Sequence, residues 1–247
     1  MAESVLTDRY LAVPDLEGLS SFQASAALLT RLGDCGKMQR SFVSTFGLEL
    51  KGAALCLRND EAHARTAVAR LFARPAMEPL LLTSWAELVA ERPGLDALVL
   101  LTSKLCNGEA TLASSRMRTR GDPEVGTTYY APRHQQAAWL DLLVQGRERI
   151  ECPVSQGYFA YCVTILCHPM RDGNGRLARA MMHGAWARAR VTAAPVIPLG
   201  PAFYQHAGEI GETMYALSET GNWEAAFSWI DGVVSKACDL AEQVARA

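Results

Sequence analysis

The sequence predicts a mainly helical bundle with one short β-hairpin. Alanine, leucine and charged residues recur at spacings of three and four along most of the chain, which is the pattern of amphipathic helices. The exception is the segment 110–132, which ends in VGTTYYAP, a sequence rich in β-branched and aromatic residues. Hydrophobic residues make up 49% of the 247 residues and charged residues 20%, which is the composition of a globular protein.

The helical pattern occurs from the first quarter of the chain almost to its end. Ser84 and Glu87 form a capping box, and Gly33, Gly94 and Gly221 are placed where helices stop or loops begin. The expected helices cover residues 22–32, 60–74, 84–92, 94–106, 135–146, 154–167, 175–190, 205–219 and 222–245.

The exception to the helical pattern is the segment 110–132. Arg116, Arg118 and Arg120 alternate with smaller or apolar residues, a Gly-Asp-Pro turn follows, and then comes the sequence VGTTYYAP. This order predicts a short β-hairpin. The three arginines can meet a substrate phosphate or an acidic target, although a solvated hairpin edge is the commoner use of such alternation.

Charge and cysteine content exclude several classes of protein. The formal net charge is −2, from 24 basic and 26 acidic residues, so no nucleic-acid partner is expected. The seven cysteines include no C-x-x-C pair, which argues against a disulfide framework and a zinc ribbon. The start lacks a secretory pattern, and the longest apolar run is too short to span a membrane. We therefore expect a soluble protein that is cytoplasmic or delivered into a host cytosol.

The most reactive stretch is HPMRDGNGR, residues 168–176. An apolar helix precedes it, and Pro169 is expected to end that helix and to hold His168 in an extended conformation. The DGNG sequence is typical of a turn, and a second helix is expected to begin at Arg176. The stretch is therefore a polar turn between two helices.

The residue types in this turn suit a polyphosphate. Gly173 and Gly175 can leave backbone N–H groups uncovered at a helix N-terminus, which makes a cradle for anions. Arg176 and Arg179 lie in the first turns of that helix, and their guanidinium groups can donate hydrogen bonds to phosphate oxygens. Asp172 suits a magnesium ion bound together with phosphates, and His168 suits a proton acceptor.

Other motifs do not fit the turn. A calcium-binding EF-hand loop from Asp172 needs glycine at its sixth position and glutamate at its twelfth, where Leu177 and His183 stand. A Walker A loop needs Gly-Lys-Ser/Thr, and a dinucleotide fingerprint needs a preceding strand. Each part of the turn also has a purely structural interpretation, and it is their joint order that favours an anion site.

The sequence HPMRDGNGRLAR, residues 168–179, resembles the motif of Fic-domain proteins, H-P-F-x-D/E-G-N-G-R-x-x-R. Met170 replaces the phenylalanine, and we expect this apolar side chain to remain a core anchor. VGTTYYAP lies where proteins of this family carry their target-docking flap, and residues 216–230 are similar to the final helix of the family. The resemblance implies a Fic-like catalytic domain at residues 80–232, after an N-terminal helical extension at 1–79 and before a C-terminal helix end at 233–247.

The resemblance implies transfer of AMP, or another nucleoside monophosphate, from ATP or another nucleoside triphosphate to a Ser, Thr or Tyr hydroxyl of a target protein. His168 is then the general base and Asp172 holds Mg²⁺. The implied phosphate ligands are Gly173, Asn174, Gly175 and Arg176 for the α- and β-phosphates and Arg179 for the γ-phosphate. The implied target-docking residues of the flap are Thr127, Thr128, Tyr129 and Tyr130.

The sequence offers a candidate inhibitory residue, and the motif also suits functions other than nucleotidyl transfer. Many members of the family are restrained by a helix or an inhibitory partner whose glutamate, in S/T-x-x-x-E-G/N, pairs with the second motif arginine. Glu17 is the nearest candidate here, with Val13 in place of Ser or Thr, and Thr83 to Glu87 lacks the final Gly or Asn. The same motif also suits a phosphotransferase, another diphosphate-donor transferase, or a non-catalytic regulatory module, although an intact His168 weighs against the last.

Overall fold

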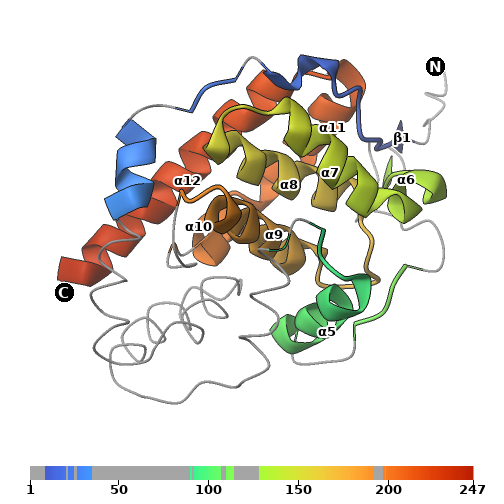
Figure 1. The fold of residues 1–247 in the computed structure, drawn as a ribbon, viewed down its shortest axis with the longest axis horizontal. Helices are drawn as coiled ribbons and strands as arrows, with labels where there is room; N and C mark the ends of the chain where they lie inside the picture. Colours follow the sequence, from blue (N-terminus) through green and yellow to red (C-terminus); the bar gives the residue numbers. More distant parts are fainter. Residues whose placement is uncertain are drawn as a thin grey trace, which may run out of the picture.

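Figure 1 shows the fold of the chain in a computed structural model. The structure describes residues 9–20, 22–24, 27–34, 90, 92–106, 110–113, 128–191, 197 and 199–246. Helices make up most of these residues and surround a central pair, α8 and α9. The predicted mainly helical fold is therefore confirmed for the described part of the chain.

The central pair consists of α8 (Pro153–Cys167) and α9 (Asn174–Arg188). Helix α8 is apolar on nearly every side, so it must be covered all round, and most of its residues are buried. Gly157 lets the indole of Trp186 approach closely, because a Cβ at residue 157 would overlap that ring. The Trp186 Nε1–H donates a hydrogen bond of 2.9 Å to the carbonyl of Val154. This contact fixes α9 against the first turn of α8.

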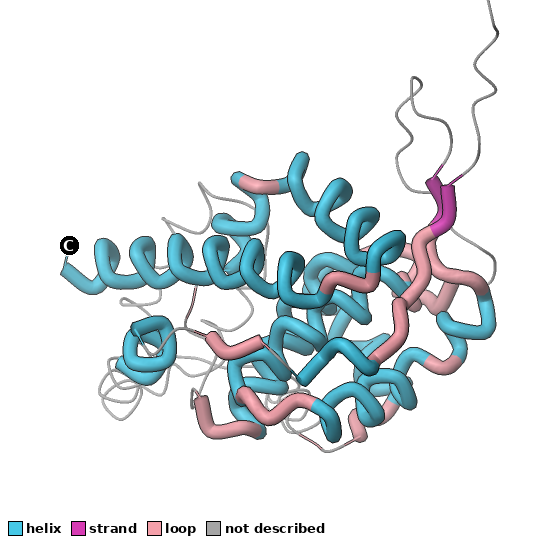
Figure 2. The backbone as a smooth tube through the Cα atoms, turned by 90° about the horizontal axis from the view of Figure 1, so that it is seen from above, coloured by secondary structure: helices cyan, strands magenta, loops and turns pink. Residues whose placement is uncertain are grey.

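Within the described ranges, further helices pack around the pair. Helix α5 (Leu95–Cys106) packs on α9, and α7 (Trp139–Arg149), which follows the short α6 (Arg133–Ala137), packs on α8. The short α10 (Leu199–Gln205) contacts α9, while α11 (Ala207–Thr220) and α12 (Trp223–Arg246) cover α8. Figure 2 shows α12 as a long rod that runs to the C-terminal end of the described chain.

The observed helix bounds follow the sequence prediction closely for α5, α8, α9, α11 and α12. The helix predicted at residues 135–146 is in fact two helices, α6 and α7, which are separated at Ala138. Residues 27–34 are helical, and Arg31 bonds to Asp239 and Glu242 of α12. Of the helices predicted at 60–74 and 84–92, the first lies outside the described residues, as does nearly all of the second.

A two-stranded sheet joins the N-terminal segment to the flap. Strand β1 (Arg9–Tyr10) pairs in parallel with β2 (Thr128–Tyr129), and Leu11 N–H donates to the Tyr129 carbonyl at 2.7 Å. The magenta strands of Figure 2 mark this pairing. The predicted hairpin lies largely at residues 114–127, outside the described part, and its described end pairs with a strand that the sequence did not predict.

The segment after β1, residues 11–19, is part of the core. Its leucines are buried. Val13 N–H donates to Gln135 Oε1 at 3.0 Å, and Gln135 Nε2 donates back to the Val13 carbonyl at 3.2 Å. Trp223 Nε1–H donates to the carbonyl of Asp15 at 2.9 Å. The beginning of the predicted 1–79 extension therefore packs on α6 and α12, while the predicted boundary at residues 79 and 80 lies outside the described residues.

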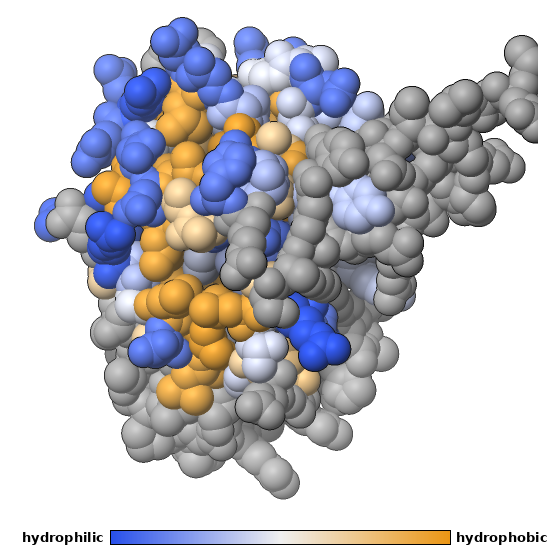
Figure 3. All heavy atoms as spheres, turned by 90° about the vertical axis from the view of Figure 1, so that its right-hand side faces the viewer, coloured by the Kyte–Doolittle hydropathy of each residue, from blue (hydrophilic) through white to orange (hydrophobic). Residues whose placement is uncertain are grey.

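Among the described residues the exposed large apolar side chains are those of Leu29, Leu95, Leu100, Leu112 and Tyr204. In the view of Figure 3, residues of high hydropathy form a strip that is bordered by polar residues. No helix in the described ranges has both the length and the apolar character that crossing a membrane requires. Among the described residues the cysteines form no disulfide: Cys106, Cys152, Cys162, Cys167 and Cys238.

The close approach of α8 and α9 predicts the effect of a single methyl group. Gly157→Ala forces the alanine Cβ into the Trp186 ring, so we expect a loss of about 1–3 kcal/mol in the free energy of unfolding. Gly232→Ala is the matched control, because residue 232 is an exposed position of α12 where the alanine Cβ meets nothing within 4 Å. Alanine favours a helix over glycine by up to about 1 kcal/mol, so this variant should be as stable as the wild type or slightly more stable. Urea unfolding measures both, and equal midpoints for the two variants would contradict this packing.

Candidate functional site

The loop between α8 and α9 begins with an unusual backbone conformation. His168 N–H donates to the Thr164 carbonyl at 3.1 Å, and the residue then adopts φ 48 and ψ 57, which is left-handed. The extended conformation predicted for His168 is therefore wrong. Proline disfavours only the right-handed helical region for the residue before it, and the last helical hydrogen bond selects the left-handed cap. The chain reverses direction at this residue.

Asn174 fastens the loop from inside. Its Oδ1 accepts the Met170 N–H at 2.9 Å, and its Nδ2 donates to the Met170 carbonyl at 2.7 Å. Asn174 is 2% exposed and Met170 is fully buried, so both bonds are shielded from water. The expectation that Met170 remains a core anchor is confirmed. The Asn174 side chain is engaged with the loop, which leaves its backbone N–H as the group that can face an anion.

A neighbouring segment supports the outside of the loop. Leu112 forms an antiparallel bridge with Met170. Ala113 N–H donates to the Pro169 carbonyl at 2.9 Å, and Arg171 N–H donates to the Thr111 carbonyl at 2.8 Å. Hydrogen bonds therefore hold the loop from its inner side, through Asn174, and from its outer side, through residues 111–113.

Gly173 forms the N-terminal cap of α9, with φ 85. A Cβ at this residue would lie 2.5 Å from Cys106 Sγ and 2.7 Å from Thr102 Cγ2, so α5 leaves room for glycine alone. Its carbonyl accepts the first helical bond, from Leu177 N–H at 2.9 Å. The N–H groups of the first turn have no acceptor within the helix, which is the arrangement that binds anions. Gly175 has no positive φ, and a Cβ there would meet only Arg179 Nη1, at 3.5 Å.

The two motif arginines occupy different environments. Arg176 is half-buried, and its Nη1 donates to Cys106 Sγ at 3.0 Å, while its Nε is buried without a partner. Arg179 is 3% exposed. Burial lowers the pKa of Arg179 to about 10, the Tyr161 hydroxyl opposes this shift, and the Arg176 charge adds to it. The Arg179 guanidinium is therefore charged at neutral pH, and both arginines lie in the first turns of α9.

Asp172 is exposed, and its Oδ1 accepts the Gly173 N–H at 2.7 Å. Among the described residues no group of three or more His, Cys, Asp or Glu side chains is placed to hold a metal. Magnesium is often bound by one or two carboxylates together with substrate phosphates and water. An exposed carboxylate beside an anion-binding turn fits that mode and does not fit a metal held by protein ligands alone.

His168 lies under an aromatic ring. The Tyr130 ring stacks on the imidazole with centroids 3.5 Å apart and planes 12° apart. The Nδ1 atom is buried and has no hydrogen-bond partner. Burial lowers the pKa of His168 to about 4, while the Ile165 carbonyl and the Asp172 charge oppose this shift. The imidazole is therefore neutral at pH 7 and able to accept a proton.

His183 lies one helical turn after Arg179 and belongs to the interior. It is 1% exposed, and its ring packs edge to face on Trp186. Burial lowers the pKa of His183 to about 3, the Arg179 charge adds to this shift, and the Ile197 carbonyl opposes it. The structure favours a packing role for this residue.

The remaining predicted residues are placed only in part. Thr128 and Tyr129 form β2 and Tyr130 follows it, whereas Thr127 lies outside the described residues, as do Arg116, Arg118, Arg120 and the segment from Thr83 to Glu87. Glu17 is exposed at the start of the short helix η1 (Glu17–Ser20), and its N–H donates to Asp15 Oδ1 at 3.1 Å. Its inhibitory role stays a prediction.

The contacts that Cys106 and Tyr130 make with the loop were not predicted from the sequence. Cys106 touches Gly173 and Arg176 from the end of α5, and Tyr130 stacks on the His168 ring. All three contacts join residues that are 38 or more positions apart. A periodicity or a short motif reports local structure, so it carries no signal for either contact.

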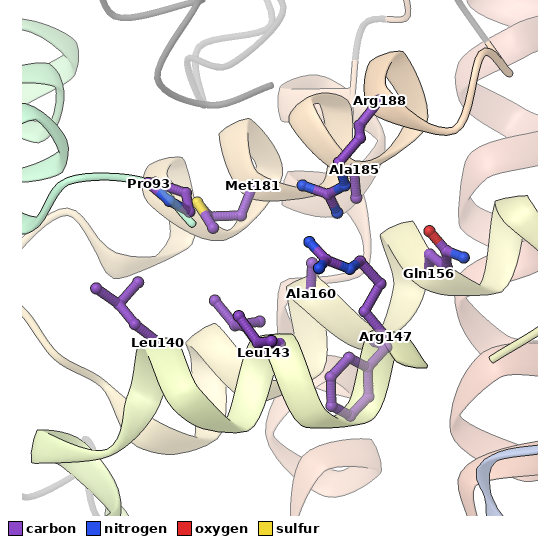
Figure 4. Close-up of a pocket in the computed structure, with 11 residues that line it drawn as sticks. Pro93, Leu140, Leu143, Arg147, Gln156, Ala160, Met181, Ala185 and Arg188 are labelled. Atoms are coloured by element: carbon purple, nitrogen blue, oxygen red, sulfur yellow. The ribbon is translucent and has the colours of Figure 1, made fainter. Parts of the chain in front are cut away.

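A separate pocket lies between α7, α8 and α9, and no predicted site residue lines it. Figure 4 shows the side chains of Arg147 and Arg188 pointing toward one another across the pocket, which Leu143, Ala160 and Met181 also line. The cavity volume is about 20 Å³, which has room for water and is far below that of an ordinary ligand pocket. The loop therefore stays the candidate site.

Solved structures with a similar fold include two Fic proteins. A Fic family protein from Desulfovibrio desulfuricans G20 matches with a TM-score of 0.57 at 13% identity, over 91% of this chain and 76% of that chain. The chain has a Fic-like fold. A Fic domain containing signaling protein from Bacteroides thetaiotaomicron VPI-5482 matches with a TM-score of 0.51 at 13% identity, over 89% of this chain and 96% of that chain. No family model and no curated protein matches the sequence.

The two buried histidines predict how stability depends on pH. Their pKa values are about 4 and 3 in the folded protein, against about 6.5 in an unfolded chain. Between these values the unfolded state binds more protons, so the free energy of unfolding falls as the pH is lowered from about 6.5 toward 4. His183→Leu replaces this buried histidine with an apolar side chain and so removes one of the two titrating groups. Urea unfolding across pH 4 to 7 should then show a shallower decline of the free energy of unfolding with falling pH. An unchanged decline would show that His183 is not buried in its neutral form.

Proposed function

We propose that the chain is a Fic-type nucleotidyltransferase that transfers AMP, or another nucleoside monophosphate, from a nucleoside triphosphate to a hydroxyl side chain of a target protein. The observation that supports this most is the composition of one rigid bend. A neutral imidazole, the first-turn N–H groups of α9 and two guanidinium groups lie within residues 168–179. The Fic-like fold agrees with this proposal and does not by itself establish the activity.

The bend supplies the groups that would hold the phosphates. The first-turn N–H groups of α9 have no acceptor within the helix, and they follow Gly173, whose positive φ turns the chain into the helix. Arg176 and Arg179 add positive charge on the same helix, and burial strengthens the attraction between a guanidinium group and a phosphate oxygen. The polyphosphate would therefore lie along the start of α9.

Asp172 would hold a magnesium ion bound with the nucleotide, because it is the exposed carboxylate of the bend. The ion, when bound, neutralises charge on the phosphate oxygens. The contribution of Asp172 is to place a fixed negative charge there, and its hydrogen bond with Gly173 N–H keeps the carboxylate oriented toward the loop.

His168 would act as the general base. The hydroxyl oxygen of the target attacks the α-phosphorus, and the bond from that phosphorus to the bridging oxygen of the leaving pyrophosphate breaks. The hydroxyl proton passes to the neutral imidazole, which is uncharged at pH 7 because it is buried. Positioning and charge neutralisation supply most of the rate in such transfers.

The decisive experiment follows the fate of each phosphate. Purified protein is incubated with magnesium and with ATP that is labelled at the α- or the γ-phosphate, together with lysate proteins. We expect the α-label to enter protein and His168→Ala to lower the initial rate by at least about 100-fold, since a general base contributes that much. His134→Ala, at an exposed position of α6, is the matched control and should keep the rate.

The same experiment separates the alternatives. Entry of the γ-label would show a phosphotransferase, because the terminal phosphate would then be the group that moves. Absence of both labels with several nucleotides would favour a non-catalytic module. Far-ultraviolet circular dichroism of each variant shows whether a loss of rate comes from unfolding.

A further inference from the structure

Tyr130 lies where the sequence predicts contact with a target, yet in the structure it contacts the imidazole. Its ring is nearly parallel to that of His168, with 3.5 Å between the ring centroids. At this distance the two rings are in full van der Waals contact, with no room for water between them. One face of the imidazole is therefore covered by a residue of this chain.

Backbone hydrogen bonds hold Tyr130 from both sides. The carbonyl of Tyr129 accepts the Leu11 N–H at 2.7 Å, which links this segment to β1. On the other side, Ala131 N–H donates to the Leu166 carbonyl at 3.1 Å, near the end of α8, and Ala131 is fully buried. The Tyr130 ring itself packs against the core. Its position is therefore set by the fold and does not depend on a bound target.

The imidazole needs such a contact. A catalytic histidine is usually oriented by a hydrogen bond at the nitrogen that does not react. Here Nδ1 is buried and makes no hydrogen bond of ordinary geometry, although the nearby Ile165 carbonyl raises the pKa of the ring. The left-handed backbone of His168 fixes where the side chain starts, and a contact as weak as that with Ile165 restricts the rotation of the ring only loosely. The stacked Tyr130 ring restricts that rotation further, and because it covers a face of the imidazole it does not itself block the edge that carries Nε2.

We propose that Tyr130 is a positioning residue, which holds the His168 ring in the orientation for proton transfer and excludes water from one of its faces. This proposal rests on the proposed function and gives Tyr130 a role toward the base in addition to the predicted contact with the target. The aromatic ring carries the role, so phenylalanine replaces tyrosine at this position and an aliphatic side chain does not. The N-terminal segment takes part through the bond from Leu11 to Tyr129.

An NMR measurement tests the contact without any substrate. The full-length protein is labelled with ¹³C-histidine, and the ring protons of His168 are assigned by their loss in His168→Gln. A stacked aromatic ring shifts protons above its face upfield. We expect this upfield shift in the wild type and in Tyr130→Phe, and we expect its loss in Tyr130→Leu. Tyr204→Leu is the control, because Tyr204 is 59% exposed on α10.

The rate of transfer tests the role. With the α-labelled assay at varied ATP, Tyr130→Leu should lower the maximal rate on the order of tenfold or more, because small errors in position are costly to proton transfer. The ATP concentration for half the maximal rate should stay unchanged, because the ring contacts the base and not the phosphate loop. Tyr130→Phe should keep the rate within about twofold, since a difference of that size is less than 1 kcal/mol.

The outcomes are distinguishable. If the wild type transfers the label but shows no upfield shift, or if Tyr130→Leu keeps the maximal rate, the positioning role is overturned and the proposed function stands. If the wild type transfers no label, the proposed function fails and the positioning role fails with it. Loss of rate in Tyr130→Leu with an unfolding midpoint like that of Tyr204→Leu, together with rescue by phenylalanine, supports the role.

Discussion

The loop between α8 and α9 keeps its shape because the Asn174 side chain bonds to both backbone groups of Met170. These two hydrogen bonds are shielded from water, so breaking either one would leave a buried polar group unpaired at a cost of about 1–3 kcal/mol. They hold the chain in a reversal that starts at the left-handed His168 and ends at the left-handed Gly173. The base and the start of α9 are therefore neighbours on one short, fixed bend.

Segments distant in sequence complete that bend. Helix α5 lies behind it, with Cys106 against both Gly173 and Arg176. Residues 110–113 bond along its outer side. Tyr130 of the flap covers the His168 ring, and the flap is in turn paired with the N-terminal strand. A site assembled in this way holds its groups in place before a ligand binds, which is what the proposed transfer would need.

Much of this arrangement could be predicted from the sequence, and the rest could not for identifiable reasons. The apolar pattern of residues 154–167 predicted a buried core helix, because an all-apolar helix must be covered, and Met170 was expected to be buried because it is an apolar replacement for the motif phenylalanine. The conformation of His168 was predicted wrongly, because the preference of a residue before proline for extended backbone was overridden by the helix-ending hydrogen bond of the His168 N–H. The pairing of β1 with the flap depends on long-range contacts that leave no local pattern.

The central claim is that the bend binds a polyphosphate, and calorimetric titration with magnesium and ATP tests it most directly. The wild type should bind, and Gly173→Ala should bind at least about tenfold more weakly, a loss of about 1.4 kcal/mol, because the alanine Cβ would meet Cys106 and Thr102 and displace the loop. Gly211→Ala, at an exposed position of α11 with nothing within 4 Å of its Cβ, should bind like the wild type. Equal affinity of a folded Gly173→Ala variant and the wild type would contradict the account.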